Sequence, residues 1–380
     1  MPESSMTGQR VDLVLEGGGV KGIALAGALE VLEERGYHPN RVAGSSAGAI
    51  AGALVTADIP AKTLVQILRE VDYTKFADGP WWTRPLLGKA LAILLRKGIH
   101  RGQYSRDWLA EQLARHGAHG GDSTFADLAY TDPDGLHLEP GGKTGEDGDT
   151  GATAEAGADA ARTEQDGPSE QAASRLTVTV SDISAGRLRL LPADADKYDF
   201  APGQLQVADA VRASTAMPFF FRPVRWRNSD GQRAYLVDGG MLSNFPVSVF
   251  DRPDGAAPRW PTFGIRLSAR PPSDPAVVNP VRGPLTFAKA LLDTLTGFRD
   301  RMHIDDQHVR ARTIFIDTGF VPTTRFDLSD EEREKLYRTG RQAATDFLDG
   351  TEGTAGSEGT EGWDFEQYVR RYRQLPDSAD

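Results

Sequence analysis

The stretch Arg41-Val42-Ala43-Gly44-Ser45-Ser46-Ala47-Gly48 reads as the end of a strand, a sharp turn and the beginning of a helix. Within it, Gly44, Ser46 and Gly48 form the pattern G-x-S-x-G, which is typical of a nucleophile elbow, a strained turn that presents a serine hydroxyl. The neighbours of the serine are all Gly, Ser or Ala, as a crowded turn requires. The stretch therefore predicts a nucleophilic Ser46 near a helix N-terminus, where amide dipoles favour negative charge. The same letters also fit a Ser/Gly-rich turn without chemistry.

A glycine-rich loop precedes this turn. Val11 to Glu16 reads as a strand, the loop Gly17-Gly18-Gly19-Val20-Lys21-Gly22 follows it, and residues 23–35 have the leucine spacing of a helix that Gly36 would cap. Loops that follow neighbouring parallel strands emerge at the same edge of the sheet, so we expect this loop beside Ser46. Its amides could then stabilise the oxygen of a carbonyl under attack, as an oxyanion hole does.

The glycine loop also has a second interpretation. Gly17, Gly19 and Gly22 spell G-x-G-x-x-G after a strand, the fingerprint of dinucleotide binding, which requires an acidic residue about 20 positions further on. The chain has Gly44-Ser45-Ser46 there instead, and the residue after Lys21 is not the Ser or Thr of a P-loop. A non-catalytic nucleotide- or lipid-binding module therefore remains only as the alternative from a different class of function.

A third segment carries a carboxylate at the end of a strand. Residues 234–238 read as a strand that ends at Asp238, and Gly239 and Gly240 follow it. Two glycines let the backbone bend and let another group come close. Taken alone, the segment also fits an ordinary turn.

Together the three segments resemble the patatin-like phospholipases, a family that combines a G-G-G-x-[KR]-G loop, a G-x-S-x-G serine and a D-G-[GA] aspartate in this order. The segment 212–218 also resembles the family's A-S-x-A-x-P motif, and the resemblance extends from about residue 11 to 246, more loosely to 317. It implies an α/β fold: a three-layer sandwich with a central, mostly parallel sheet and helices on both faces. It implies Ser46 as nucleophile and Asp238 as base. The residues implied for the oxyanion hole are Gly17, Gly18, Gly19, Lys21 and Gly22, and those that support the motifs are Gly44, Gly48, Gly239 and Gly240.

The resemblance implies a Ser-Asp dyad that hydrolyses acyl esters of lipids through an acyl-serine, with no cofactor and no metal. An acyltransferase that excludes water from the acyl-serine would use the same residues. If the chain followed the order of an α/β-hydrolase triad instead, His303 or His308 would complete it after Asp238. Both histidines lie in a polar run, so the dyad is the preferred hypothesis.

Composition limits the location and the partners. The chain has 380 residues, no cysteine and a formal net charge of 43 − 54 = −11. Disulfides and cysteine metal sites are therefore excluded. The polar N-terminus and the absence of about 18 consecutive apolar residues predict a cytoplasmic protein without a signal or a spanning helix. We expect a lipid or acyl ester substrate, peripheral membrane contact and no nucleic acid; the oligomeric state stays open.

We predict a patatin-like domain over residues 9–320 and a C-terminal helical extension over 321–380 with a flexible stretch at about 351–362. Residues 139–172 are acidic, rich in Gly, Ala and Thr, and free of aromatic residues, which predicts a disordered insert. Amphipathic patterns predict helices over 285–301 and 329–348, the second with a capping box of Ser329 and Glu332. The tryptophans and apolar residues of 81–95, with Arg96 and Lys97 after them, fit either a buried helix or a membrane-interfacial segment.

Overall fold

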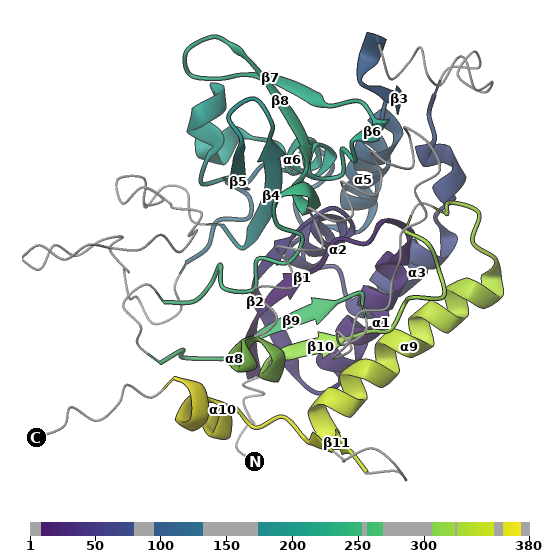
Figure 1. The fold of residues 1–380 in the computed structure, drawn as a ribbon, viewed down its shortest axis with the longest axis vertical. Helices are drawn as coiled ribbons and strands as arrows, with labels where there is room; N and C mark the ends of the chain where they lie inside the picture. The colour runs from purple at the N-terminus through teal and green to yellow at the C-terminus, as the bar shows by residue number, and fades with distance from the viewer. Residues whose placement is uncertain are drawn as a thin grey trace, which may run out of the picture.

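A mixed β-sheet lies at the centre of the computed structural model, which describes residues 9–79, 95–131, 174–252, 257–268, 306–323, 325–352 and 360–373 (Figure 1). The strand order in these residues is β10-β9-β1-β2-β4-β8-β7, and β5 pairs with β4. The strands are β1 (Gln9–Leu15), β2 (Tyr37–Gly44), β4 (Leu176–Asp182), β5 (Arg187–Leu191), β7 (Val224–Arg227), β8 (Arg233–Asp238), β9 (Thr262–Arg266) and β10 (Thr313–Phe315).

Parallel and antiparallel pairs divide the sheet into two halves. The neighbours from β10 to β4 all pair in parallel, whereas β5, β8 and β7 join by antiparallel pairs. Parallel strands are covered on both faces and are therefore continuously apolar. Strand β1 follows this rule over Val11–Leu15, where every residue is buried. Its one polar member, Asp12, is paired with Arg41 and also accepts a hydrogen bond from the Trp260 indole.

One face of the sheet packs against most of the described helices. Odd-numbered residues of β1 point into this main core, together with the apolar residues of the helices. These helices are α1 (Gly22–Glu34), α2 (Ala47–Thr56), α3 (Ala61–Glu70), α5 (Gln103–His116), α6 (Val207–Ser214) and α9 (Asp330–Asp349). Helices α9 and α1 approach each other closely, because a Cβ added to Gly340 would lie only 2.0 Å from the carbonyl oxygen of Ala24.

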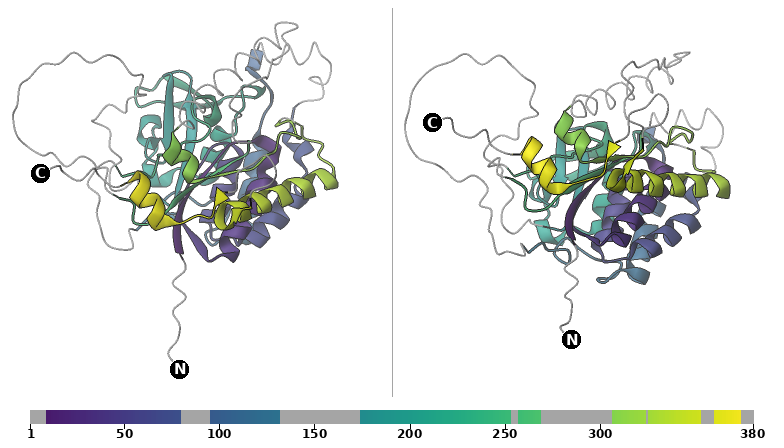
Figure 2. Two further views of the ribbon diagram at one scale, coloured as in Figure 1. Left: turned by 60° about the horizontal axis from the view of Figure 1, so that its bottom comes forward. Right: turned by 90° about the horizontal axis from the view of Figure 1, so that it is seen from below.

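The opposite face carries a smaller apolar cluster. Val14 and Ala43 point to this side, where they meet Phe245, Val247 and Val309. Val309 belongs to helix α8 (Gln307–Ala311), which lies on the other side of the sheet from α1 and α9 (Figure 2). The expected α/β architecture, a largely parallel sheet between two layers, is confirmed. Within the described residues, the two layers are unequal in size.

Several short elements complete the described chain. Strand β3 (Gly98–His100) pairs in parallel with β6 (Phe219–Phe221), and β11 (Gly350–Thr351) pairs with β12 (Thr360–Glu361). Helix α10 (Phe365–Tyr372) is followed by Arg373, which binds the carboxylate of Asp251 at 2.6 Å. The 3-10 turns are η1 (Gly19–Lys21), η2 (Tyr73–Phe76), η5 (Ala195–Tyr198), η6 (Pro202–Gln204) and η7 (Gly239–Met241).

Helix α9 begins as predicted. The Ser329 amide donates to the Glu332 carboxylate at 3.0 Å, and the Glu332 amide donates to the Ser329 hydroxyl at 3.2 Å, which completes the capping box. The predicted helix over 285–301, the acidic insert over 139–172, the tryptophans at 81 and 82 and most of the stretch 351–362 lie outside the described residues. The division of the chain at residue 320 stays a prediction. In the described residues, no helix has the length and apolar character needed to cross a membrane.

Candidate active site

The serine turn has the geometry of a nucleophile elbow. Strand β2 ends at Gly44, helix α2 begins at Ala47, and Ser46 between them has φ 51° and ψ −115°. A positive φ in a non-glycine residue is strained and needs surroundings that hold it. A Cβ at Gly44 would lie 2.3 Å from the Gly48 carbonyl oxygen, and one at Gly48 would lie 2.2 Å from that of Leu15. Both glycines are therefore required by close backbone packing.

Strand register brings Asp238 to the level of Ser46. Gly44 on β2 pairs with Val178 on the parallel strand β4, and Val180 on β4 pairs with Asp238 on β8. Ser46 lies two residues beyond Gly44, as Val180 lies two residues beyond Val178. The serine and the aspartate therefore stand on either side of β4, roughly 10 Å apart along the sheet at the backbone. Their side chains close this gap.

The Ser46 hydroxyl and the Asp238 carboxyl group interact. Both residues are buried, with 8% and 7% of their surface exposed. Burial raises the pKa of the Asp238 carboxyl group to about 6, while hydrogen bonding from the Gly240 amide, at 2.8 Å, and from Ser46 opposes this rise. A carboxylate with a pKa near neutrality can accept a proton and return it, which suits a general base.

The glycine loop lies beside the serine, as expected for loops at the same sheet edge. A Cβ added to Gly17 would lie 3.1 Å from the Cβ of Ser46. Among the described residues, the amides of Gly18 and Gly19 have no hydrogen-bond acceptor. Gly19 has φ +57°, and a Cβ there would lie 2.4 Å from the Thr323 carbonyl oxygen. Free amides near the nucleophile are what an oxyanion hole needs.

Two further members of the loop, Gly22 and Lys21, have different surroundings from the three glycines before them. A Cβ at Gly22 would meet no atom closer than 3.9 Å, so close packing does not require a glycine there. Lys21 is half-buried, and burial lowers the pKa of its ammonium group against the opposing charges of Glu16 and Asp317. Lys21 does not contribute to the pKa of Asp238. The carboxylates of Glu16 and Asp317 therefore lie near the Lys21 ammonium group.

The aspartate turn uses both of its glycines. A Cβ at Gly239 would lie 2.3 Å from the Thr179 hydroxyl, and one at Gly240 would lie 2.6 Å from Oδ1 of Asn244. The tight turn η7 follows Asp238 directly, and the Asp238 side chain caps it by accepting from the Gly240 amide. These contacts explain the D-G-G sequence.

Two residues that the sequence reasoning missed hold the site together. The Ser214 hydroxyl accepts a hydrogen bond of 2.9 Å from the Ser46 amide, and this bond is buried. Asn244 donates from its side chain to the Gly17 carbonyl at 3.1 Å, and its own carbonyl accepts from the Gly17 amide at 3.4 Å. Asn244 thus joins the glycine loop to the turn after Asp238. Ser214 lies in the segment 212–218, whose resemblance to the family motif pointed to this part of the chain. No motif pointed to Asn244.

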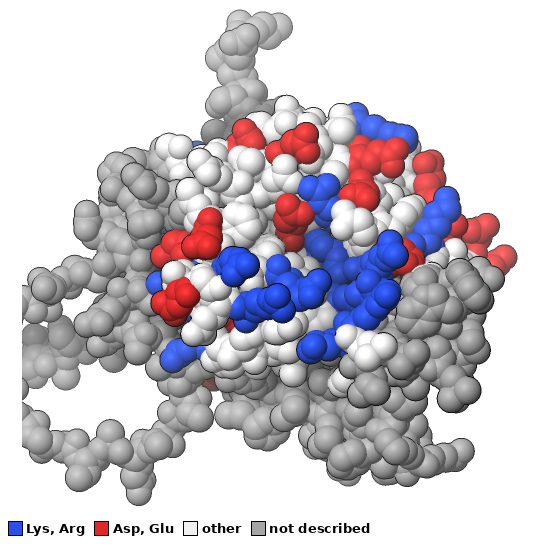
Figure 3. Space-filling view, turned by 90° about the horizontal axis from the view of Figure 1, so that it is seen from above, with Lys and Arg blue, Asp and Glu red and all other residues white. Residues whose placement is uncertain are grey.

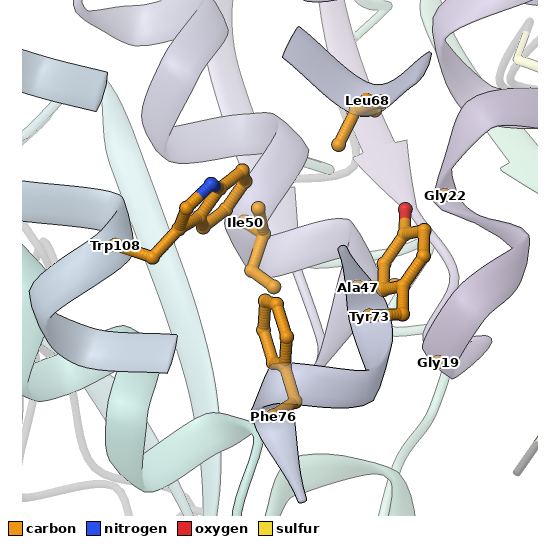
Figure 4. A pocket seen from close by; sticks show the side chains of 8 residues that line it. All are labelled: Gly19, Gly22, Ala47, Ile50, Leu68, Tyr73, Phe76 and Trp108. Carbon is orange, nitrogen blue, oxygen red and sulfur yellow. The ribbon is translucent and has the colours of Figure 1, made fainter. Parts of the chain in front are cut away.

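An apolar pocket is lined in part by Ala47, the residue that follows Ser46 in the sequence (Figure 4). Its cavity volume is only about 20 Å³, because the side chains that line it nearly fill it. Its floor is aromatic, since the ring of Phe76 lies 5.7 Å from those of both Tyr73 and Trp108. The residues that line it are Gly19, Gly22, Ala47, Ile50, Leu68, Tyr73, Phe76 and Trp108. The walls have the apolar character that a hydrocarbon chain needs, and such a chain would enter only if these side chains moved apart.

Neither a histidine nor a metal cluster enters the site in the described part of the chain. Here no histidine forms a hydrogen bond with Ser46 or Asp238. His308 lies on α8, with Asp306 at 4.0 Å, and burial together with Arg312 and Arg373 lowers its pKa. His303 lies outside the described ranges. Across these ranges no three His, Cys, Asp or Glu side chains gather as metal ligands would.

Fold and site together define a class: an α/β protein in which a serine elbow meets an aspartate. The profile of the family described as Patatin-like phospholipase matches residues 13–251, which hold both of these residues. The uncharacterized protein YqhO of Bacillus subtilis (strain 168) is 31% identical over 339 residues, covering 89% of this chain and 98% of that protein. The chain belongs to the patatin-like phospholipase family.

Two bacterial structures are similar to the chain. VipD from Legionella pneumophila matches with a TM-score of 0.45 and 19% identity, over 89% of this chain and 66% of that one. ExoU in its heterodimeric complex with SpcU, from the type III secretion system of Pseudomonas aeruginosa, matches with a TM-score of 0.42 and 18% identity, over 89% and 51%. The chain thus spans less than two thirds of the length of either protein.

Proposed function

We propose that the protein hydrolyses the carboxylic ester bonds of lipids, with phospholipids or lysophospholipids as the substrate class. The observation that carries this proposal is the meeting of the strained Ser46 with the buried Asp238 beside an apolar pocket. Membership of the patatin-like phospholipase family supports the lipid nature of the substrate.

In the proposed first step, Asp238 accepts the proton of the Ser46 hydroxyl while the serine oxygen attacks the ester carbonyl carbon. The carbonyl oxygen becomes negatively charged and receives hydrogen bonds from the free amides of Gly18 and Gly19. The amide of Ala47, the first residue of α2, is a further candidate donor, because it directly follows the nucleophile. The ester C–O bond then breaks, and the leaving alcohol takes the proton from Asp238.

The second step releases the fatty acid. Water loses a proton to Asp238 and attacks the acyl carbon, and the bond between that carbon and Ser46 breaks. The serine oxygen recovers its proton from Asp238, which restores the dyad. During both steps we place the acyl chain between Ile50, Phe76 and Trp108, whose side chains move apart to admit it.

A two-substrate assay tests the proposal. The purified protein is given p-nitrophenyl butyrate and, separately, phosphatidylcholine or lysophosphatidylcholine in mixed micelles, and free fatty acid is quantified. We expect both ester classes to be hydrolysed by the wild type and neither by Ser46→Ala. Release of fatty acid that persists in Ser46→Ala would overturn the assignment of the nucleophile. Transfer of the acyl group to added glycerol, with no free fatty acid, would identify an acyltransferase instead.

A further inference from the structure

Positive charge gathers on the face that carries the β7–β8 hairpin (Figure 3). We call this region the arginine face and define it by Lys97, Arg101, Arg222, Arg225, Arg227 and Arg233. In the hairpin, Arg227 lies directly opposite Arg233, and Arg225 lies opposite Tyr235. Like charges that face each other across an antiparallel pair are destabilising. The arrangement therefore costs stability unless an anion binds there.

Much of this charge has no counter-ion among the residues that the structure describes. The side chains of Arg101, Arg225 and Arg233 form no ion pair with the acidic residues of the described ranges. Lys97 lies over the ring of Tyr235, with its Nζ 5.0 Å from the ring centre, rather than against a carboxylate. The acidic residue of the hairpin turn, Asp230, forms no ion pair with them either.

Arg222 is the member of the arginine face whose guanidinium group is partly buried. Its Nε and Nη2 atoms are buried and have no hydrogen-bond partner. Burial lowers its pKa, and the positive charges of Arg96, Arg101 and Arg225 lower it further.

Within the described residues, Asp78 is the carboxylate whose negative charge raises the pKa of Arg222. Its oxygens are already engaged, because they accept hydrogen bonds from the backbone amides of Gly102, Gln103 and Tyr104 at 2.8, 2.8 and 3.2 Å. Asp78 therefore caps the start of α5 through these amides, and no direct hydrogen bond from Arg222 to it is found. A shallow hollow lined by Arg225, Trp226, Arg227 and Arg233 offers guanidinium groups to an external anion.

Exposed apolar side chains adjoin the charge. Phe219 is 45% exposed and Leu95 is 66% exposed, two of the few large apolar side chains left open in the described residues. Strand pairing puts Phe219 opposite Gly98, the neighbour of Lys97. Basic groups beside exposed aromatic and aliphatic side chains are typical of surfaces that bind at the membrane–water boundary. This surface is connected to the candidate site. The Ala216 carbonyl, shortly before β6, accepts a hydrogen bond from the Asp238 amide at 3.0 Å.

We propose that the arginine face, with Phe219 and Leu95, docks on the surface of an anionic phospholipid bilayer and so brings the Ser46 site to its substrate. The inference rests on the lipid substrate of the proposed function. A bilayer accounts for both the basic and the apolar side chains, whereas a nucleic acid would account only for the charge. The net charge of −11 makes the attraction a local property of this face.

Vesicle binding tests the inference independently of catalysis when all proteins carry Ser46→Ala. The vesicles contain phosphatidylcholine alone or with roughly a third phosphatidylserine, and binding is measured by co-sedimentation over a salt series. Each basic residue near an anionic surface contributes about fivefold to the partition coefficient. We therefore expect Arg225→Gln/Arg227→Gln/Arg233→Gln to weaken binding to the anionic vesicles by roughly 100-fold and to flatten its salt dependence.

A matched control removes the same number of charges elsewhere. Arg338→Gln/Arg370→Gln/Arg371→Gln changes three exposed arginines of α9 and α10, far from the hairpin (Figure 1). It is expected to bind anionic vesicles within about threefold of the parent. Phe219→Asn, which suits a positive φ, removes the apolar contact and should weaken binding roughly three- to tenfold without changing the salt dependence.

Three results would overturn the inference: equal binding to the two kinds of vesicle, equal losses in the two triple variants, or tighter binding of a DNA duplex than of anionic vesicles at the same salt. Hydrolysis of p-nitrophenyl butyrate by the hairpin variant with Ser46 restored verifies its folding. If that soluble ester is hydrolysed normally while vesicle binding is unchanged, the docking surface is wrong and the proposed function stands. If the wild type hydrolyses no ester but binds anionic vesicles through this face, the proposed function is wrong and the docking surface stands.

Discussion

The Ser46 hydroxyl interacts with the Asp238 carboxyl group across strand β4, which separates the two strands that carry them. Parallel pairing on one side of β4 and antiparallel pairing on the other bring a residue after β2 and the last residue of β8 to the same level. The sheet itself therefore aligns the pair, and the Ser214 hydroxyl and the Asn244 side chain fix the loops around it.

The pKa of Asp238 predicts the acid limb of the pH–rate profile. The base must be ionised to accept the serine proton, and burial raises its pKa to about 6. We expect kcat/KM for a soluble ester to be constant well above pH 6 and to fall about tenfold for each pH unit below it. A limb with its midpoint near pH 4 would contradict the buried environment described for this carboxylate.

Asp238→Asn is expected to stabilise the protein while it abolishes hydrolysis. A carboxyl group whose pKa is raised by folding contributes most stability below its unfolded value, and this contribution is lost as pH rises through about 6. At pH 8 the ionised Asp238 therefore opposes folding, by up to about 3 kcal/mol for a shift of this size. Urea unfolding should show Asp238→Asn to be more stable than wild type at pH 8, with the difference shrinking toward pH 4. Asp230→Asn, in an exposed turn, is the control with no expected difference. Equal stability at pH 8 would argue against the raised pKa.

Asn244→Ala should impair turnover more than binding. The substitution removes the hydrogen bond to the Gly17 carbonyl and loosens the glycine loop relative to Asp238. A misplaced oxyanion donor affects the transition state more than the ground state, so we expect kcat to fall about 10- to 100-fold with KM within a fewfold. Asn40→Ala, which removes an amide bonded to Tyr130 at 3.3 Å, is the control. An unchanged kcat in Asn244→Ala would show that the loop does not need this tie.

Phe76→Ala should shift the acyl preference toward longer chains. The ring forms part of the pocket floor, so its removal extends the space available beyond Ile50. We expect the ratio of kcat/KM for p-nitrophenyl dodecanoate to that for the butyrate to rise about tenfold or more, alongside a loss of about 3–5 kcal/mol in stability. Phe347→Ala, in the apolar core beside Phe263, controls for stability alone. If both variants change the ratio equally, the pocket does not hold the acyl chain.

Local features of the site could be predicted from the sequence because they depend on backbone geometry. Gly44 and Gly48 are required where backbones touch, and this requirement is visible as small residues around Ser46. The pairing of Ser46 with Asp238 needed the family resemblance, since 191 residues separate them along the chain and no local pattern encodes the register of β4. Asn244 and the pocket residues of η2 and α5 act through tertiary contacts, so their roles could not be predicted from the sequence alone. The clustering of the arginines of β7 and β8 could not be predicted either, because it depends on the pairing of the two strands in the hairpin.

Covalent trapping of the nucleophile tests the Ser46–Asp238 site most directly. The chain is treated with a fluorophosphonate, which reacts with activated serines, and the adduct is located by mass spectrometry. Ser45→Ala is the matched control, because the neighbouring Ser45 hydroxyl is buried without a hydrogen-bond partner. We predict one adduct, on Ser46, in wild type and Ser45→Ala, slow labelling in Asp238→Asn and none in Ser46→Ala. An adduct on another residue, or full labelling of Ser46→Ala, would contradict the site.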